Sequence, residues 1–413
     1  MNILYITPYV PSRIRTRPYN LIQALVRLRH RVTLLTTAGT LPEEQAQAEE
    51  LRSHGVDTEV FSVSLTRSLA NCLRALPTRE PFQAVYAYHP RMEERLGDLL
   101  RSKTFDIIHI EHLRASRLVR AVLGSSSDGN RVPAAYDSVD SISLLFEQAA
   151  QAGAQWRSRL MTAIDLERTR RYEAQLLTRY DQVVVTSRRD REALETLAHQ
   201  YLPKSIQPAP VTVIANGVDL DYFRPQEGLA RDERTVVFTG KMSYHANITA
   251  ALYFAQQVLP RIWTKAPEVR FQVVGKDPPE AVRRLAEDER VQVIGTVDDL
   301  RPYLAQAVVA VCPVLYAVGI QNKVLEAMAM GTPVVCTSAA FASLHAQAGK
   351  EVLVAHDPEE FAAHVLQICS NPSLAQRLAT AGRRYVENHH NWENAAGRLI
   401  EVYEQARFEA RKE

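Results

Sequence analysis

The sequence predicts an α/β protein built from two Rossmann-like domains, and three observations support this. Apolar segments of strand length alternate with longer amphipathic segments along both halves of the chain, the pattern of parallel sheets covered by helices. The strand-length segments are apolar on both faces, as buried parallel strands are. The length of 413 residues exceeds one ordinary core and suits two domains.

Composition narrows the class of protein. Hydrophobic residues make up 46% of the chain and charged residues 23%, as in globular proteins. The net charge of +2 indicates no polyanionic partner such as nucleic acid. Residues 1–218 hold 28 basic against 23 acidic residues. This small excess leaves a peripheral contact with an anionic membrane open, beside the simpler interpretation of a solvated surface.

The sequence also predicts a cellular compartment. Its four cysteines are widely spaced and form no Cys-x-x-Cys pattern, which suits free thiols in a reducing environment. Residues 1–10 are apolar but short and lack a basic segment, so we expect a first strand rather than a signal peptide. No segment approaches 18 uninterrupted apolar residues. We therefore expect a cytoplasmic protein, with contact at the inner membrane face left open.

The elements of the first half follow from the apolar segments. We expect strands at 2–6, 31–36, 58–63, 105–111, 132–136, 182–186 and 211–214, and helices at about 18–28, at 41–54, within 65–102 and along 141–179. A loop, 7–18, follows the first strand. The polar segment 224–234 contains Pro and Gly and predicts a linker. We place an N-terminal domain at 1–218 with a returning helix at about 390–413, and a C-terminal domain at 219–389.

In the second half, three successive strands end in glycine. Strands at 235–239, 270–274 and 291–294 run into Gly240, Gly275 and Gly295. A helix is expected at about 248–263, and the chain reads as helical from 358 to its end. Ligands of open α/β sheets bind at the carboxyl edge of the strands, so these glycines mark a candidate binding edge.

The segment 308–336 carries the clearest site pattern. An apolar strand leads through a loop into a short helix beginning near Asn322, which Gly331 and Pro333 end. Lys323 and Glu326 lie three residues apart on one helix face. A lysine at a helix N-terminus suits a phosphate, and a carboxylate one turn further suits the vicinal diol of a ribose. The pattern predicts a nucleotide pocket; an ordinary surface Glu-Lys pair is the alternative.

Five ordered motifs resemble those of the GT-B glycosyltransferases of family 4, over nearly the whole chain. They are the domain-junction segment 214–225, the strand-loop segments 237–241 and 273–276, the base-binding segment 295–304, and the donor loop and helix 319–335. The segment 136–141, Tyr-Asp-Ser-Val-Asp-Ser, is similar to family members in surface polysaccharide biosynthesis.

The resemblance implies a fold and a reaction. Two Rossmann-like domains would face each other across a cleft, with the final helix crossing back to the N-terminal domain. A sugar would pass from a UDP- or GDP-sugar to a glycan, lipid-linked or small-molecule acceptor with retention of configuration. The donor phosphate itself would take the acceptor proton, so that positioning supplies much of the rate. No metal or other cofactor is implied; Asp219 and Asp221 fit an Asp-x-Asp pattern but belong to the junction motif.

The same resemblance implies the donor-binding residues. Lys241 and Lys323 would stabilise the leaving diphosphate as catalytic cations, Glu326 would bind the ribose, and Asp298 would meet the base. The full set is Gly240, Lys241, Gly275, Lys276, Asp298, Gly319, Ile320, Gln321, Asn322, Lys323 and Glu326. One position departs from the family pattern, because Val318 stands where a glutamate usually precedes Glu326 by eight residues. Gln321 and Asn322 would then take over recognition of the donor sugar.

The acceptor is expected to bind the N-terminal domain. Arg13, Arg15 and Arg17 alternate in the loop after the first strand and could contact a diphosphate or an anionic acceptor. Solvated loop residues are the alternative.

Further polar residues follow the later strands. Glu111 and His112 are candidates to orient the acceptor hydroxyl or stabilise charge at the reacting sugar, whereas many relatives have histidine in place of Glu111. A buried, hydrogen-bonded role is the alternative for the neighbouring His109. Asp137 and Asp140 are candidates for an acceptor base, should a protein group rather than the donor phosphate take the proton, with helix capping as the alternative for Asp140.

Two glutamates and two rival functions complete the predictions. Glu167 and Glu173, in the arginine-rich tract 141–179, are expected in ion pairs. Rival functions that keep the fold are a nucleotide-sugar epimerase and a catalytically silent partner subunit.

Overall fold

The structure is a computed structural model, and it describes residues 1–13, 15–39, 42–118, 131–151, 156–226, 228, 231–316 and 320–410, with side chains for all of these except 149–151 and 156–164. The chain divides into two compact units. Unit 1 comprises Met1–Ala215 together with Trp392–Glu413, and unit 2 comprises Asn216–Asn391. Each unit is built on one parallel sheet, which confirms the predicted α/β class.

Unit 1 contains a seven-stranded sheet of order β3-β2-β1-β4-β5-β6-β7. Its strands are β1 (Asn2–Thr7), β2 (Arg31–Ala38), β3 (Asp57–Ser62), β4 (Ile107–Glu111), β5 (Ala134–Val139), β6 (Gln182–Val185) and β7 (Val211–Val213). The central strand β1 pairs on one side with β2, where Ile3 lies opposite Val32, and on the other with β4, where Ile3 lies opposite Ile107.

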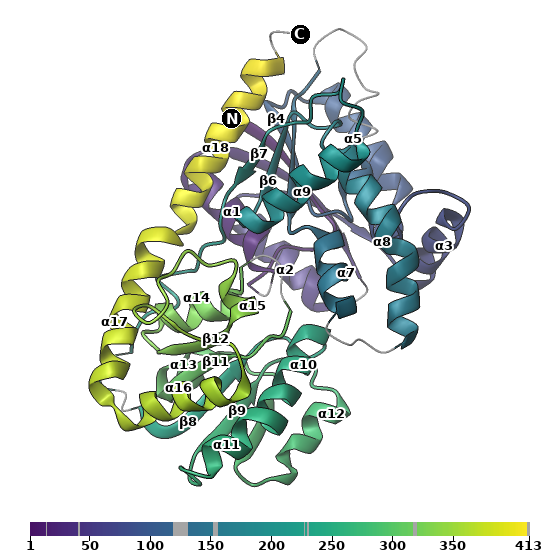
Figure 1. The fold of residues 1–413 in the computed structure, drawn as a ribbon. Helices are drawn as coiled ribbons and strands as arrows, with labels where there is room; N and C mark the ends of the chain where they lie inside the picture. The colour runs from purple at the N-terminus through teal and green to yellow at the C-terminus, as the bar shows by residue number, and fades with distance from the viewer. Residues whose placement is uncertain are drawn as a thin grey trace. The chain divides into compact units, whose positions relative to one another are not determined.

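Helices cover both faces of this sheet (Figure 1). They are α1 (Thr16–Arg27), α2 (Pro42–Ser53), α3 (Leu65–Ala75), α4 (Phe82–Tyr86), α5 (Pro90–Ser102), the short η1 (Ser116–Leu118), α7 (Ile142–Gln151), α8 (Trp156–Leu176), α9 (Arg188–Tyr201) and α18 (Trp392–Ala410). Because side chains alternate along a strand, β1 supplies both cores: Ile3 and Tyr5 pack on one face, Leu4 and Ile6 on the other.

The C-terminal helix α18 belongs to unit 1. Trp392, Leu399 and Tyr403 join the same core cluster as Tyr5, on the face that also holds Leu21 of α1. The predicted return of the last helix to the N-terminal domain is therefore confirmed. Among the described residues, no helix combines the length and apolarity that crossing a bilayer requires.

Unit 2 contains a six-stranded parallel sheet of order β10-β9-β8-β11-β12-β13. Its strands are β8 (Asp232–Thr239), β9 (Arg270–Val274), β10 (Val291–Gly295), β11 (Ala307–Cys312), β12 (Val334–Thr337) and β13 (Leu353–Ala355). Its helices are α10 (His245–Tyr253), the π-helical η2 (Phe254–Val258), α11 (Leu259–Trp263), α12 (Glu280–Arg283), η3 (Arg284–Glu287), α13 (Arg301–Gln306), α14 (Asn322–Ala329), α15 (Ser338–Phe341), α16 (Pro358–Ser370) and α17 (Pro372–His389).

Two local expectations in this unit need correction. Strand β8 begins at Asp232, inside the predicted linker, because the guanidinium of Arg231 donates to the carbonyl oxygens of Ala307 (2.8 Å) and Gly331 (2.6 Å) and so anchors the polar segment to the sheet. The helix expected at about 248–263 contains a π-helical turn, η2, before Pro260. Proline has no backbone N–H to donate, which favours such an irregularity just ahead of it.

Candidate functional site

The first candidate group lies at the carboxyl edge of the unit 2 sheet. In that sheet β8 and β11 are neighbours, β9 and β10 extend to one side, and β12 and β13 extend to the other. The connections that leave β8 and β11 therefore run to opposite sides, which opens a crevice between them at the carboxyl ends. Gly240 follows β8, and the segment that leads into α14 follows β11.

Two of the predicted glycines bring backbones into close approach here. Gly240 and Gly275 both have a φ of 151°, which side-chain-bearing residues rarely adopt. A Cβ on Gly275 would lie 1.7 Å from the carbonyl oxygen of Gly240, and a Cβ on Gly240 would lie 3.2 Å from Cε of Lys323. The two loops are also joined by a hydrogen bond from the Met242 amide to the Lys276 carbonyl (2.8 Å). No side chain fits at Gly275, and Lys323 lies against the Gly240 backbone.

Helix α14 carries the predicted lysine and glutamate. Nζ of Lys323 donates to Oε1 of Gln321 at 3.0 Å, just ahead of the helix. Burial raises the pKa of Glu326 to about 7, and the nearby charge of Lys323 opposes that shift. The side chain of Asn322 accepts a hydrogen bond from Asn216 Nδ2 (3.2 Å). Lys323 and Glu326 are thus close enough to interact, with their amide neighbours Gln321 and Asn322 held in place.

The remaining predicted donor residues differ in exposure. Lys241 and Asp298 are exposed, Lys276 is half-buried, and Ile320 is buried. Gly319 and Val318 lie outside the described residues, so the loop with the unusual valine stays a prediction.

Two polar groups near these residues were missed by sequence reasoning. The side chain of Asn247 donates from Nδ2 to the Lys241 carbonyl (2.9 Å), while its buried Oδ1 has no hydrogen-bond partner within the described part of the chain. Beside Asp298, the Asp299 carboxylate forms a bidentate pair with Arg301 (2.9 and 2.8 Å), whose guanidinium stacks on the Tyr222 ring at 4.1 Å. The two-residue spacing of Asp299 and Arg301 could have indicated their ion pair from the sequence. No sequence pattern indicated the role of Asn247.

The second candidate group lies at the carboxyl edge of the unit 1 sheet, and a buried ion pair is at its centre. Arg17 donates from Nε to Oδ2 of Asp137 at 2.8 Å, and its NH1 donates to the Ile214 carbonyl at 3.0 Å. The Arg17 side chain is 4% exposed and that of Asp137 is 0% exposed. The other oxygen of Asp137 accepts from the Val139 amide at 3.0 Å.

This pair corrects two sequence expectations. Helix α1 begins at Thr16, so Arg17 is a buried helical residue and not a loop residue available to an acceptor. Arg13 is exposed and Arg15 is half-buried, so the three arginines do not form one row. Both oxygens of Asp137 are engaged by Arg17 and by backbone, which is a positioning role rather than that of an acceptor base.

Glu111 lies beside this pair without a cation of its own. Its carboxyl group accepts from the hydroxyls of Tyr5 (2.7 Å) and Tyr9 (3.2 Å). Burial raises the pKa of Glu111 to about 8, and the charge of Asp137 adds to the shift. A carboxyl group poised to gain or lose a proton near neutral pH suits general acid–base chemistry.

The two histidines of β4 and its end are neutral at neutral pH. His109 is fully buried, stacks on Tyr5 at 4.1 Å and hydrogen-bonds through Nδ1 to the Tyr403 hydroxyl at 2.9 Å, in agreement with its structural alternative. Burial lowers the pKa of His109 to about 4 and that of His112 to about 3. His112 has a φ of 70°, a strained value for a non-glycine residue, and its Nδ1 accepts from the Arg114 amide at 3.2 Å.

His109, Glu111 and Asp137 raise the question of a metal. Their candidate ligand atoms all lie within 4.8 Å of one another. The Arg17 guanidinium lies 2.7 Å from Asp137 Oδ2 and already supplies a positive charge there, and Nδ1 of His109 is bonded to Tyr403. Nε2 of His109 is buried without a hydrogen-bond partner within the described part of the chain, but a metal ion there would be repelled by the Arg17 guanidinium that already pairs with Asp137, so the cluster does not fit a metal centre.

Three acidic side chains further along unit 1 are also placed. Asp140 accepts from the Thr186 hydroxyl (3.2 Å), and burial together with the charge of Asp190 raises the pKa of Asp140 to about 7. Glu167 pairs with Arg171 at 2.9 Å, as predicted. The prediction for Glu173 is wrong: its buried carboxylate caps α7 by accepting from the amides of Ile142 (2.7 Å) and Ser143 (3.3 Å).

Ionisation of Glu111 should make the protein less stable as the pH rises. The native state keeps this proton up to about pH 8, whereas the unfolded chain releases it near the ordinary pKa of 4.5. The native state therefore binds more protons between these values, and the free energy of unfolding falls with rising pH across them. Between about pH 5 and about pH 8, the unaltered protein should lose more of its free energy of unfolding than Glu111→Gln does. The difference between the two losses should exceed about 1 kcal/mol, because one pKa unit is worth about 1.4 kcal/mol.

Urea unfolding at the two pH values measures this difference. Glu94→Gln is the matched control, because Glu94 is an exposed glutamate of the same unit. Equal pH dependence in the Glu111→Gln protein and the unaltered protein would show that Glu111 is already ionised in the native state.

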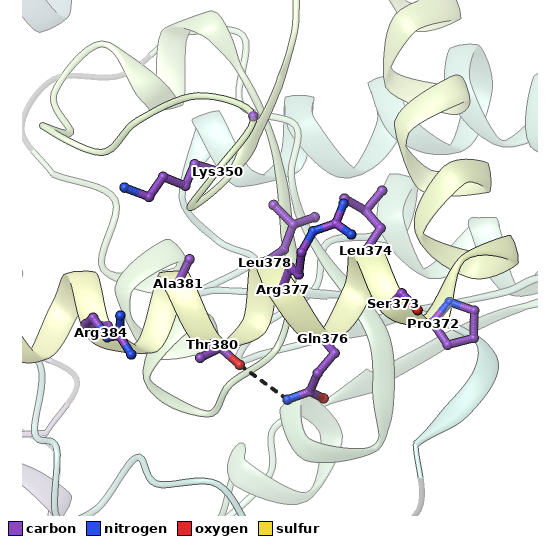
Figure 2. A pocket seen from close by; sticks show the side chains of 11 residues that line it. Lys350, Pro372, Ser373, Leu374, Gln376, Arg377, Leu378, Thr380, Ala381 and Arg384 are labelled. Atoms are coloured by element: carbon purple, nitrogen blue, oxygen red, sulfur yellow. Dashed lines mark hydrogen bonds between the residues drawn. The ribbon is translucent and has the colours of Figure 1, made fainter.

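A third feature, in unit 2, holds none of the predicted residues. A cavity of about 900 Å³ lies along α17, and Figure 2 shows the side chains that line it, among them the cationic Lys350, Arg377 and Arg384. Gln376 donates to Thr380 along the same helix at 3.3 Å. Neither Gly240, Gly275 nor any residue of α14 lines this cavity. This cavity is therefore separate from the predicted donor residues.

Comparisons with known proteins identify the family of both units. Residues 15–222 match the model for Glycosyltransferase Family 4, and residues 233–371 match that for glycosyl transferases group 1. A D-inositol 3-phosphate glycosyltransferase of Nocardioides sp. is 27% identical over 58% of this chain and 57% of its own length. A phosphatidyl-myo-inositol mannosyltransferase of Mycolicibacterium smegmatis is 30% identical over 52% and 56%. The chain spans about half the length of these curated relatives.

Solved structures match over nearly the whole chain. Anabaena HepE in complex with UDP superposes with a TM-score of 0.64 at 15% identity, covering 97% of this chain and 99% of that one. Sucrose-phosphate synthase from Thermosynechococcus elongatus gives a TM-score of 0.67 at 18% identity, covering 98% and 99%. These structures share the fold, and the family models cover both units. The chain belongs to glycosyltransferase family 4 and has the GT-B fold.

Proposed function

We propose that this protein is a retaining glycosyltransferase that moves a sugar from a UDP- or GDP-sugar to a glycan, lipid-linked or small-molecule acceptor, without a metal ion. The observation that carries the proposal is the arrangement of Lys323, Glu326 and Gly240 at the carboxyl edge of the unit 2 sheet. Family membership supports the transfer reaction. The UDP in the Anabaena HepE structure supports a uridine nucleotide as the donor.

The donor half of the reaction uses the residues of unit 2. Lys323 and Lys241 neutralise the charge that develops on the leaving diphosphate, a task that fixed cations can perform in place of a metal. The backbone amides that begin α14 add to this field. Glu326 accepts hydrogen bonds from the ribose hydroxyls, and Asp298 meets the base. Gln321 and Asn322 face the donor sugar.

The acceptor half uses the residues of unit 1. Glu111 orients the acceptor hydroxyl, with its carboxyl group positioned by Tyr5 and Tyr9. The neutral His112 is a second hydrogen-bonding group for the acceptor or the reacting sugar. Asp137 acts indirectly, by fixing Arg17 under this edge. The names of two relatives, which refer to inositol phosphate and phosphatidylinositol, support an acceptor that carries a phosphate. The segment 136–141 supports a role in surface polysaccharide biosynthesis.

A transfer assay tests the proposal. The protein is incubated with UDP-glucose, UDP-N-acetylglucosamine or GDP-mannose, with and without D-inositol 3-phosphate or a bacterial lipid extract. Nucleotide release that requires an acceptor, with retained configuration in the product and no loss on addition of EDTA, is the expected result. Sugar isomerisation without release would identify an epimerase, and a protein that binds nucleotide but gives neither product would be a silent partner subunit.

A further inference from the structure

Helix α3 exposes its apolar side to solvent and buries its polar side, the reverse of an ordinary surface helix. Leu65, Leu69, Leu73 and Leu76 are 74%, 63%, 65% and 52% exposed. Their spacings of four, four and three residues put them on one side of the helix, a surface that we call the leucine face. The side that is buried against the unit instead carries small and polar residues, Ser68, Asn71 and Ala75.

Polar contacts hold α3 in this orientation. Asn71 Nδ2 donates to the Tyr88 carbonyl at 2.9 Å, and the Ser64 hydroxyl caps the helix by accepting from the Arg67 amide. At the other end, the guanidinium of Arg168 donates to the carbonyl oxygens of Ala75 (3.4 Å) and Leu76 (2.9 Å). The exposed leucines are therefore presented by a helix fixed at its start, its middle and its end.

The segment that carries the leucine face is itself cationic. Residues 64–79 contain Arg67, Arg74 and Arg79, all exposed, and no Asp or Glu. An exposed apolar helix face accompanied by cations and lacking acids is complementary to an anionic lipid surface, into which the apolar side chains insert while arginines reach the phosphates.

A cavity continues from the start of α3 toward the carboxyl edge of the sheet. It measures about 210 Å³, and Leu65 and Ser68 of α3 line it together with Arg15, Tyr9 and Arg114. The Arg15 guanidinium stacks on Tyr9 at 4.5 Å, and its NH2 lies 3.5 Å from Glu44. Among the described residues no carboxylate pairs with Arg114, whose Nε donates to Gln83 at 2.8 Å. Because Glu44 also lines this cavity and pairs with Arg15, the cation that the cavity offers to an anionic head group is Arg114.

We propose that the leucine face docks unit 1 on the surface of a bilayer that contains anionic lipid. This places the arginine-lined cavity at the level of the lipid head groups, within reach of a membrane-borne acceptor. In Figure 1, α3 lies at the outer margin of unit 1, in keeping with a docking element. The inference concerns an interaction surface and goes beyond the transfer reaction, since docking requires neither donor nor catalysis.

Vesicle sedimentation with the full chain tests the docking. The unaltered protein should pellet with vesicles of phosphatidylcholine and phosphatidylglycerol and much less with phosphatidylcholine alone, because the arginines require anionic lipid. Leu69→Gln combined with Leu73→Gln should lower the partition coefficient at least about tenfold, since both side chains would leave the interface. Leu28→Gln combined with Ile206→Gln is the matched control, because these residues are exposed apolar residues elsewhere in unit 1, and it should bind like the unaltered protein.

Each other outcome overturns the docking proposal. Absence of binding to either vesicle, or equal binding by the leucine variant, removes the leucine face as a membrane surface. Conversion of a dimer to a monomer by the leucine variant, without vesicle binding, would make this face a contact between copies. Because the altered leucines are exposed, the thermal midpoint should not change. UDP binding, measured in the same samples without lipid, shows separately whether the donor site stands.

Discussion

Arg17→Met should lower the free energy of unfolding by about 3–5 kcal/mol, the usual result when one partner of a buried ion pair is removed. Methionine preserves most of the apolar stem but leaves the carboxylate of Asp137 buried without its cation. The carbonyl of Ile214 also loses its hydrogen bond from Arg17. Desolvation of the unpaired charge is the larger part of the expected loss.

The matched control is Arg13→Met, which changes an exposed arginine four residues earlier and should alter stability by no more than about 0.5 kcal/mol. Urea unfolding of the three proteins at neutral pH gives the comparison. A loss below about 1 kcal/mol in Arg17→Met would mean that Asp137 is hydrated in solution and that the edge of the unit 1 sheet is more open than the structure shows. The double variant Arg17→Met, Asp137→Asn should recover part of the loss.

Glu326→Gln should weaken the binding of UDP or a UDP-sugar by about 10- to 100-fold, because hydrogen bonds to a charged group contribute about 1.5–3 kcal/mol. The same change should raise stability above about pH 7. Burial raises the pKa of Glu326 from 4.5 to about 7, so the unfolded chain ionises this group more readily than the native state does. The free energy of unfolding of the unaltered protein therefore falls as the pH rises from 4.5 to about 7. Glutamine does not ionise, so the variant does not lose this stability. If the variant binds more weakly but is more stable, Glu326 serves ligand binding and not the stability of the fold.

Isothermal titration with UDP and thermal unfolding at about pH 8 measure the two effects. Glu289→Gln, an exposed glutamate in the same unit, is the control and should change neither quantity. Unchanged UDP affinity in Glu326→Gln would place the nucleotide elsewhere and would remove the main support for the donor site.

The sequence predicted the features that depend on local pattern. The apolar strand segments that end at Gly240 and Gly275 are recognisable from their residues alone. Lys323 and Glu326 are neighbours because residues three apart lie on the same face of a helix. The pairing of Arg17 with Asp137 depends instead on tertiary structure, because the two residues are 120 positions apart in the sequence. No local pattern carries that information.

Helix α3 shows why the remaining features could not be predicted. Leucines at helical spacing ordinarily mark the buried face, so the pattern of Leu65, Leu69 and Leu73 predicts the wrong side of the helix as core. The side that carries Asn71 is buried because Asn71 donates to the Tyr88 carbonyl and α3 packs against α4, and neither contact can be read from the spacing of the leucines. Likewise, helical spacing in the arginine-rich tract 141–179 predicted an ion pair for Glu167, which the structure confirms with Arg171, but the same spacing could not show that Glu173 would cap α7.

The position of α18 has a consequence for the order in which the protein is made. Tyr403 hydrogen-bonds His109 across 294 residues, and Trp392 and Leu399 complete the core over β1. Domains generally fold as they emerge during synthesis, the N-terminal one first. Here residues 1–215 of unit 1 lack a wall of their core until α18 has left the ribosome, whereas unit 2 is continuous in sequence, precedes α18 and can close before it. The edge of the unit 1 sheet that carries Glu111 and its two tyrosines therefore matures after unit 2.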